Sequence, residues 1–286
     1  MDGRAPVKDE TVELNGLRFH YRDWGNEGAP VLLLQHAYTS HARSWDTFAR
    51  SVRDRYRVLA LDLRGHGETA WAPEYRPELL VEDLAAFKAA LGLERFTLLG
   101  FSIGAHSAYQ YAARHPRAVD RLILVEVNPQ SGPASVAWLR SWLDRPDLLE
   151  DPEDAVRSVR SFDPRAPDEE LRHWTVNNLL RRGDGRWTWR YDPVLRSASP
   201  PSLKPEATAI REDLAKIACP TLLVHGAESE MSSYEEAEQT ARLIPGGRLL
   251  HIAGAGHWVP MDKPIDFLAT VEEFLDGMRV DRAVPR

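Results

Sequence analysis

Ser102 lies in a sequence pattern that can turn a serine into a nucleophile. The pattern is Gly100-Phe101-Ser102-Ile103-Gly104, with an aliphatic run before it and a helix-like segment, residues 105–114, after it. A sharp turn from strand to helix crowds the backbone on both sides of the serine, and glycine relieves that crowding because it has no side chain. The hydroxyl is then exposed above the positive end of a helix dipole. The expected chemistry is attack on a carbonyl carbon.

The apolar runs of the chain predict a rigid support for this serine. Two alternating segments flank Asn15-Gly16, a dipeptide that favours a tight hairpin turn. Six aliphatic runs follow, with helical patterns between most of them, and such alternation indicates an α/β fold with a mostly parallel sheet covered by helices on both faces. Ligands bind at the carboxyl ends of the strands in these sheets. Eight strands are expected, at residues 11–14, 17–24, 31–35, 57–61, 96–100, 121–127, 221–225 and 248–252.

The alternation of strand and helix lapses between residues 131 and 209. This stretch carries helical patterns at residues 134–143, 153–161 and 168–180, and an aromatic segment at residues 186–191. It is far too long for a structureless loop. We therefore expect a helical cap, residues 131–209, inserted into a core that residues 1–130 and 210–286 form together.

The composition excludes several classes of function. With 286 residues, of which 43% are hydrophobic, the chain can bury one sizeable core and an inserted subdomain. A net charge of −7 without a run of Lys or Arg argues against nucleic acid as a partner. The single cysteine, Cys219, excludes an internal disulfide framework and a cysteine-rich metal site. No leader-like or membrane-spanning apolar run is present, so we expect a cytoplasmic monomer or homodimer that acts on a small molecule.

Further motifs make the chain similar to the α/β-hydrolases from about residue 31 to about residue 275. His36-Ala37-Tyr38 resembles the H-G-x loop of that family, and Asp62-Leu63-Arg64-Gly65-His66-Gly67 resembles its D-x-R-G-x-G loop. The resemblance implies that the backbone N–H groups of Tyr38 and Ile103 bind the oxyanion. Ala37 stands where the family favours glycine, and it can still present the next amide if its φ stays negative.

The resemblance also implies a catalytic base, His257. It follows Gly254-Ala255-Gly256, after the last predicted strand and before a final amphipathic helix at residues 265–278. None of the nine other histidines combines a glycine-rich loop with this position, and none has the H-E-x-x-H spacing of a metal site. We expect no metal and no cofactor.

The acid of the triad is open among three glutamates. The family usually supplies it after the strand that precedes the last one, where Gly226-Ala227-Glu228-Ser229-Glu230 resembles a G-x-x-S-D variant with Glu230 in place of the aspartate. Glu126, at the end of an earlier strand, occupies a second site from which some members supply the acid. We expect Glu230 to orient His257, with Glu126 and then Glu228 as the alternatives.

The resemblance implies a serine hydrolase that cleaves a small, rather apolar ester or lactone through an acyl-enzyme. A carbon–carbon bond hydrolase acting on a vinylogous diketone, or a ligand-binding protein on the same scaffold, are the alternatives. Tryptophans of the cap are expected either to dock it on the core or to line an apolar pocket; as substrate-binding residues we expect Trp138, Trp142, Trp174 and Trp187. An arginine of the cap could bind a substrate carboxylate, among Arg181, Arg182, Arg186 and Arg190.

Overall fold

An eight-stranded sheet forms the centre of the computed structural model, which describes residues 5–129, 132–197 and 199–277. The strand order is β1-β2-β4-β3-β5-β6-β9-β10. The hairpin β1–β2 is antiparallel and joins β4 in antiparallel pairing, while every other neighbouring pair is parallel. The strands are β1 (Lys8–Leu14), β2 (Leu17–Asp23), β3 (Val31–Gln35), β4 (Arg57–Leu61), β5 (Phe96–Phe101), β6 (Val119–Val125), β9 (Thr221–Gly226) and β10 (Arg248–Ile252).

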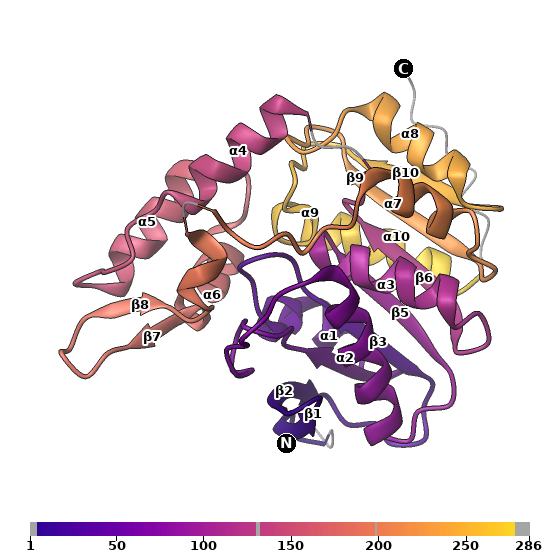
Figure 1. The fold of residues 1–286 in the computed structure, drawn as a ribbon, viewed down its shortest axis with the longest axis horizontal. Helices are drawn as coiled ribbons and strands as arrows, with labels where there is room; N and C mark the ends of the chain where they lie inside the picture. Colours follow the sequence, from indigo (N-terminus) through magenta and orange to yellow (C-terminus); the bar gives the residue numbers. More distant parts are fainter. Residues whose placement is uncertain (1–4, 130–131, 198, 278–286) are drawn as a thin grey trace.

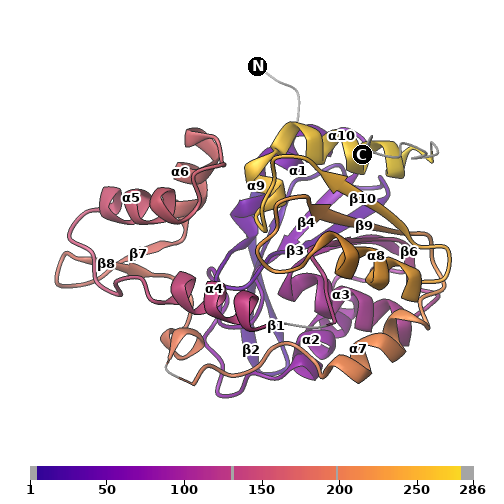
Figure 2. The same cartoon turned by 90° about the horizontal axis from the view of Figure 1, so that it is seen from above.

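Helices cover both faces of the sheet (Figure 2). One face packs against α1 (Asp46–Val52) and α10 (Pro264–Leu275), with α9 (Val259–Asp262) and the short 3₁₀ turn η1 (Ala42–Trp45) beside them. The other face packs against four helices, α2 (Pro77–Ala90), α3 (Ile103–Arg114), α7 (Ala207–Leu214) and α8 (Tyr234–Leu243). Each layer buries its own cluster of aliphatic and aromatic side chains, which explains why the central strands read as continuous apolar runs.

The fold class predicted from the sequence is confirmed. The runs at residues 31–35, 57–61 and 248–252 are strands with those bounds. Asn15 and Gly16 form the turn of the β1–β2 hairpin. Their φ angles of 50° and 77° are both positive, as a type I′ turn requires.

The segment between β6 and α7 projects to one side of the core (Figure 1). It holds three helices, α4 (Pro133–Leu143), α5 (Pro152–Phe162) and α6 (Asp168–Asn177), a small antiparallel pair, β7 (Leu179–Arg181) and β8 (Trp187–Trp189), and a 3₁₀ turn, η2 (Pro193–Arg196). The helix expected at residues 168–180 therefore ends early. The aromatic segment becomes β8, because pairing with β7 gives its backbone groups hydrogen-bond partners.

Two boundaries expected from the sequence, at residues 130–131 and at Met278, lie outside the described residues. After the projecting segment, α7 returns to the core and packs against α3. Within the described parts of the chain, no helix is both long enough and apolar enough to cross a membrane.

Candidate active site

Ser102 occupies a sharp turn between β5 and α3. Its backbone has a φ of 53° and a ψ of −112°, a combination that strains a residue with a side chain. A Cβ atom on Gly100 would lie 2.3 Å from the carbonyl oxygen of Gly104, and one on Gly104 would lie 2.6 Å from that of Gln35. Both glycines are thus needed for close approach of the backbone, as the sequence pattern predicted.

The loop after β3 faces the same cavity as the serine. Ala37 and Tyr38 line this cavity together with Ser102 and Ile103. Ala37 does not appear among the described residues with positive φ, so alanine adopts this backbone without strain. The Tyr38 hydroxyl donates a hydrogen bond to the carbonyl oxygen of Leu195, which ties the loop to the projecting segment.

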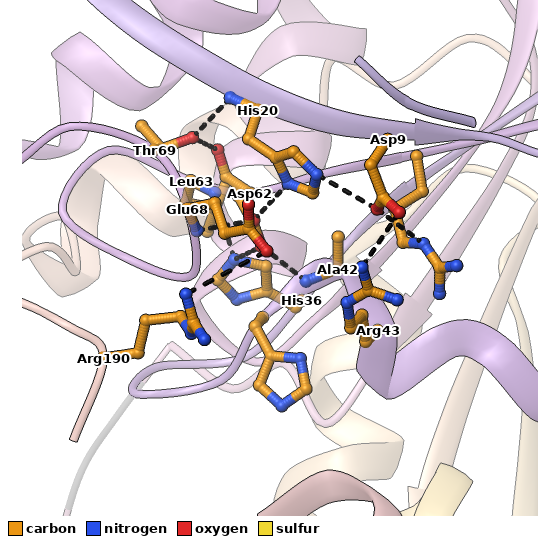
Figure 3. A network of polar contacts seen from close by, with 12 residues as sticks. Asp9, His20, His36, Ala42, Arg43, Asp62, Leu63, Glu68, Thr69 and Arg190 are labelled. Carbon is orange, nitrogen blue, oxygen red and sulfur yellow. Dashed lines mark hydrogen bonds and ion pairs between the residues drawn. The ribbon is translucent and has the colours of Figure 1, made fainter. Parts of the chain in front are cut away.

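A buried carboxylate connects this loop to its neighbour after β4 (Figure 3). Asp62 accepts hydrogen bonds from the backbone N–H of Ala42 at 2.5 Å, from that of Glu68 at 2.9 Å and from His20 Nδ1 at 2.6 Å. Burial alone would raise the pKa of Asp62, but the hydrogen bond from His20 and the nearby imidazoles outweigh it and hold this pKa at about 2. His36 Nε2 accepts from the Leu63 backbone N–H at 3.0 Å and adds a second link between the two loops.

His257 lies in the loop after β10, and its side chain is buried. Its Nδ1 atom lies 3.0 Å from Glu126 Oε2. His257 and Ser102 both line the cavity. A partner at Nδ1 leaves Nε2 as the ring nitrogen that can take a proton from a nucleophile.

Glu126 has the geometry of an orienting carboxylate. Its Oε1 accepts a hydrogen bond from the Gly226 backbone N–H at 2.7 Å, and its Oε2 accepts from the Ser229 hydroxyl at 2.6 Å. The φ of Glu126 is 55°, a strained value for a non-glycine residue, and such strain is concentrated at functional sites. The three hydrogen bonds, from Gly226, Ser229 and His257, hold the carboxylate against the imidazole.

The structure corrects the expected partner of the imidazole. Glu230 does not meet His257 Nδ1; its Oε2 accepts from the backbone N–H of His257 at 3.1 Å, and its Oε1 accepts from Arg165 at 2.7 Å. Glu228 also faces Arg165, at 3.5 Å. Glu126 follows β6, which pairs with β9, and its carboxylate is held there by the Gly226 N–H and the Ser229 hydroxyl, while Glu230 is held by Arg165 and the His257 backbone N–H. Ser229 of the G-x-x-S motif therefore serves Glu126.

A buried pair of carboxyl groups lies behind the histidine loop. Asp262 accepts a hydrogen bond from the Gly256 backbone N–H at 2.8 Å. Burial, together with a hydrogen bond and the charge of Asp163, raises the pKa of Asp262 to about 9, so Asp262 is protonated at neutral pH. Asp163 comes from the projecting segment and Asp262 from the core, so this pair joins the two.

The cavity at Ser102 has a volume of about 310 Å³, within the range of small-molecule sites. Most of its wall is apolar. The lining residues outside the groups already described are His106, Asn128, Trp138, Leu139, Trp142, Leu143, Pro200, Pro201, Ser202, Leu203, Lys204, Met231, Ser232 and Trp258.

Two of the four expected tryptophans line this cavity. Trp138 lies with its ring 5.4 Å from that of His257, and Trp142 donates a hydrogen bond to Thr39 at 2.9 Å. Trp174 and Trp187 were expected there but do not line it. Trp174 packs behind Trp142 with a ring separation of 5.7 Å, and Trp187 belongs to β8, away from the serine.

None of the four arginines considered for a substrate carboxylate lines the cavity either. Arg181 and Arg182 are exposed, Arg186 pairs with Asp184, and Arg190 bonds the Leu179 carbonyl. The cation in the lining is Lys204, which sequence reasoning missed because no motif surrounds it. Among residues 5–129, 132–197 and 199–277, no group of His, Cys, Asp or Glu is arranged to hold a metal ion.

A family model described as the alpha/beta hydrolase fold matches residues 30–264. The chain belongs to this family. It is 28% identical to the N-formylmaleamate deformylase of Pseudomonas putida over 94% of this chain and 97% of that protein. It is 26% identical to the sn-1-specific diacylglycerol lipase of Mus musculus over 88% and 82% of the two chains.

A solved structure repeats the whole architecture. The crystal structure of E-2-(acetamidomethylene)succinate hydrolase superposes on 95% of this chain and 100% of its own, with a TM-score of 0.87 and 21% identity. This likeness shows the fold. The deformylase and the lipase are both hydrolases, so a hydrolase activity of this chain is supported.

Proposed function

We propose that this α/β-hydrolase is a serine hydrolase that cleaves a small, rather apolar carboxylic ester or lactone. In the proposal Ser102 is the nucleophile, His257 the base and Glu126 the acid, in place of Glu230. The observation that carries it is the 3.0 Å contact between His257 Nδ1 and the Glu126 carboxylate, beside the cavity that Ser102 lines. The backbone of Glu126 is strained, with a positive φ.

The reaction proceeds in two acyl-transfer steps. Ser102 Oγ attacks the carbonyl carbon while His257 Nε2 takes its proton, and the oxyanion binds the backbone N–H groups of Tyr38 and Ile103. His257 then returns the proton to the leaving alkoxide, which departs as an alcohol. Water attacks the acyl-enzyme with the same base and releases the acid and the free Ser102 hydroxyl. Glu126 holds the tautomer and stabilises the imidazolium.

The cavity and its cover support a small substrate. A volume of about 310 Å³ with a largely apolar wall suits a compact body with few polar groups. Residues 131–209 act in this proposal as a cap over the site, with Trp138 and Trp142 as its contribution to the wall. The partner is the small-molecule substrate, and no cofactor takes part in these steps.

A fluorophosphonate probe tests the nucleophile, because it reacts with a serine activated by an imidazole and not with ordinary serines. We expect mass spectrometry to locate the adduct on Ser102 and a chromogenic ester to be hydrolysed. Ser232 lines the same cavity and provides a matched control, since Ser232→Ala should keep labelling and Ser102→Ala should lose it.

Three results would contradict the proposal. Folded protein without label, or label on Ser232, would remove the assigned nucleophile. Turnover of a vinylogous diketone with no ester hydrolysis would assign the site to carbon–carbon bond cleavage. Tight binding of small apolar ligands without any turnover would make the chain a binding protein on this scaffold.

A further inference from the structure

Ser229 and His257 meet the same oxygen atom of Glu126. The Ser229 hydroxyl lies 2.6 Å from Glu126 Oε2, and His257 Nδ1 lies 3.0 Å from this atom. The other oxygen, Oε1, accepts a hydrogen bond from the Gly226 backbone N–H at 2.7 Å. The serine therefore shares with the imidazole the oxygen on which the orientation of His257 depends.

The hydrogen of the Ser229 hydroxyl points to this carboxylate. A carboxylate only accepts hydrogen bonds, so the hydroxyl must donate. Ser229 Oγ itself accepts from the Met231 backbone N–H at 3.2 Å, and a hydroxyl that accepts from an N–H group becomes a stronger donor. The backbone N–H of Ser229 donates to the Gly226 carbonyl oxygen at 3.0 Å, which closes the turn after β9. These two backbone bonds fix the hydroxyl beside Glu126.

The bond from Ser229 affects how strongly Glu126 holds a proton on His257. A hydrogen bond to a carboxylate stabilises its negative charge, and a carboxylate whose charge is already stabilised attracts a nearby imidazolium less. Without the Ser229 hydroxyl, the charge on Oε2 would act more fully on the imidazole. His257 would then release its proton only at higher pH, and it would be a base over a narrower pH range.

We propose that Ser229 is a positioning residue of this hydrolase, whose hydroxyl binds part of the Glu126 charge and thereby keeps His257 unprotonated, and so competent as a base, at lower pH. The inference rests on the proposed function, because it takes His257 as the base and Glu126 as its acid. Ser229 does not line the cavity at Ser102, so it acts through Glu126 and not on the substrate.

Other titratable groups lie around the Glu126–His257 pair. Burial raises the pKa of Asp262, behind the histidine loop, to about 9, so Asp262 stays protonated in the acid range. Burial lowers the pKa of His251 to about 4 and that of His106 well below its usual range. All of these groups are retained in the Ser229 variants, so a difference between pH profiles reports the changed hydroxyl. Also near the pair are His225 at 4.0 Å from Glu126 Oε1, the ion cluster of Asp163, Arg165, Glu228 and Glu230 at the histidine loop, and Lys204 in the cavity wall, whose pKa burial lowers to about 8.

The pH profile of kcat/KM tests the inference. A neutral 4-nitrophenyl ester is hydrolysed from about pH 5 to about pH 9, with absorbance read at the isosbestic wavelength of nitrophenol and nitrophenolate and enzyme-free rates subtracted. The variants are Ser229→Ala, which lacks the hydroxyl, and Ser229→Thr, which keeps one. Ser51→Ala is the matched control, because the Ser51 hydroxyl donates to the Thr47 carbonyl oxygen at an exposed position on α1. Labelling of Ser102 by the fluorophosphonate shows that each variant is folded.

We expect the acid limb of the Ser229→Ala profile to lie at higher pH than that of wild type, by about 0.5–1 unit. One hydrogen bond to a charged group corresponds to about 1–2 pH units on the carboxylate itself, and His257 experiences part of this change through Oε2. Above the limb the two profiles should approach each other, because His257 is then unprotonated in both proteins. Ser229→Thr and Ser51→Ala should keep the wild-type limb.

A spectroscopic measurement tests the same bond without a substrate. The proton on His257 Nδ1 lies in the hydrogen bond to Glu126 Oε2, and we expect its resonance far downfield in the ¹H NMR spectrum, where His257→Gln should remove it. In Ser229→Ala this resonance should move further downfield at low pH, because Oε2 then binds the imidazolium more strongly. Its titration follows His257 directly and separates this histidine from His225.

Two outcomes would overturn the inference while Ser102 is still labelled. One is an acid limb of Ser229→Ala at or below the wild-type pH. The other is a loss of kcat/KM by one factor at every pH, which a purely structural role of Ser229 would produce. If Ser229→Ala does not fold, Ser229→Cys replaces it, since a thiol is a weaker donor and should move the limb in the same direction by less. An unmoved limb in Ser229→Cys would again overturn the inference, whereas wild-type protein without label on Ser102 would contradict the proposed function itself.

Discussion

Replacing Glu126 with glutamine should remove nearly all turnover while keeping the fold. The carboxylate accepts three hydrogen bonds, from the Gly226 N–H, the Ser229 hydroxyl and His257 Nδ1. A glutamine offers one oxygen and one NH₂ group at the same two positions. The tautomer of the imidazole depends on whether the oxygen or the NH₂ group of the glutamine faces His257. The backbone N–H of Gly226 determines that orientation.

The Gly226 N–H cannot rotate away, so the glutamine oxygen must face it. The opposite orientation would leave a buried N–H against an NH₂ group, at a cost of about 1–3 kcal/mol. With the oxygen on Gly226, the NH₂ group points at His257 Nδ1, which must then accept. The proton moves to Nε2, and the ring can no longer take the proton of Ser102. Loss of the working tautomer lowers kcat by about 10⁴ in other triads, equal to about 5.4 kcal/mol.

Glu230→Gln is the matched comparison. Glu230 bonds the backbone N–H of His257 and the partly exposed Arg165. The glutamine oxygen can keep the backbone bond, and Arg165 retains contacts to Asp163 and Glu228. We therefore expect less than about a tenfold loss of kcat, since a partly exposed ion pair contributes about 1 kcal/mol or less.

The assay is steady-state hydrolysis of a neutral 4-nitrophenyl ester by wild type and both variants. Circular dichroism and thermal unfolding verify that each is folded, and mass spectrometry after long exposure to fluorophosphonate verifies that the label stays on Ser102. A larger loss for Glu230→Gln than for Glu126→Gln would refute the assignment. Equal, mild losses would mean that neither carboxylate alone sets the tautomer.

Three further changes probe other parts of the site. Ser102→Gly should abolish turnover and raise the melting temperature, because glycine tolerates a φ of 53° that costs serine about 1 kcal/mol or more. Ser102→Ala keeps the strained backbone and should not be stabilised. Equal melting temperatures of the glycine and alanine variants would contradict the strain. Because burial and Asp163 raise the pKa of Asp262 from 3.8 to about 9, the folded state holds a proton that the unfolded chain releases, and the free energy of unfolding should fall as pH rises between those values. Asp262→Asn, whose NH₂ group replaces the proton of the Asp262 carboxyl, should flatten this slope in a denaturation series and be more stable than wild type by about 1–3 kcal/mol near pH 8. An unchanged slope would place the proton elsewhere. Trp138→Ala should lower kcat/KM for an apolar ester by about tenfold or more, whereas Trp187→Ala, outside the cavity, should stay within about twofold; the reverse order would move the substrate away from this wall.

The sequence determined the features that depend on neighbouring residues. The turn at Ser102 follows in part from Gly100, whose missing side chain lets the backbone approach the nearby Gly104, and the hairpin follows from Asn15-Gly16. The central strands were visible because both of their faces are buried, so each reads as an unbroken apolar run. Steric contacts between neighbouring residues and the burial of apolar runs depend on residues close together in the chain, so they can be predicted from the sequence.

Only the tertiary structure decided which distant side chains meet. Glu126 and Glu230 both follow core strands. Glu126 meets His257 because the Gly226 N–H and the Ser229 hydroxyl hold its carboxylate there, whereas Arg165 and the His257 backbone N–H hold Glu230. Lys204 entered the cavity because the chain returns to α7 beside α3, while Trp174 came to lie behind Trp142. Hydrogen bonds and charge pairing act over a few ångströms in space between residues far apart in the chain, so strand order and packing determine these contacts, and local pattern does not.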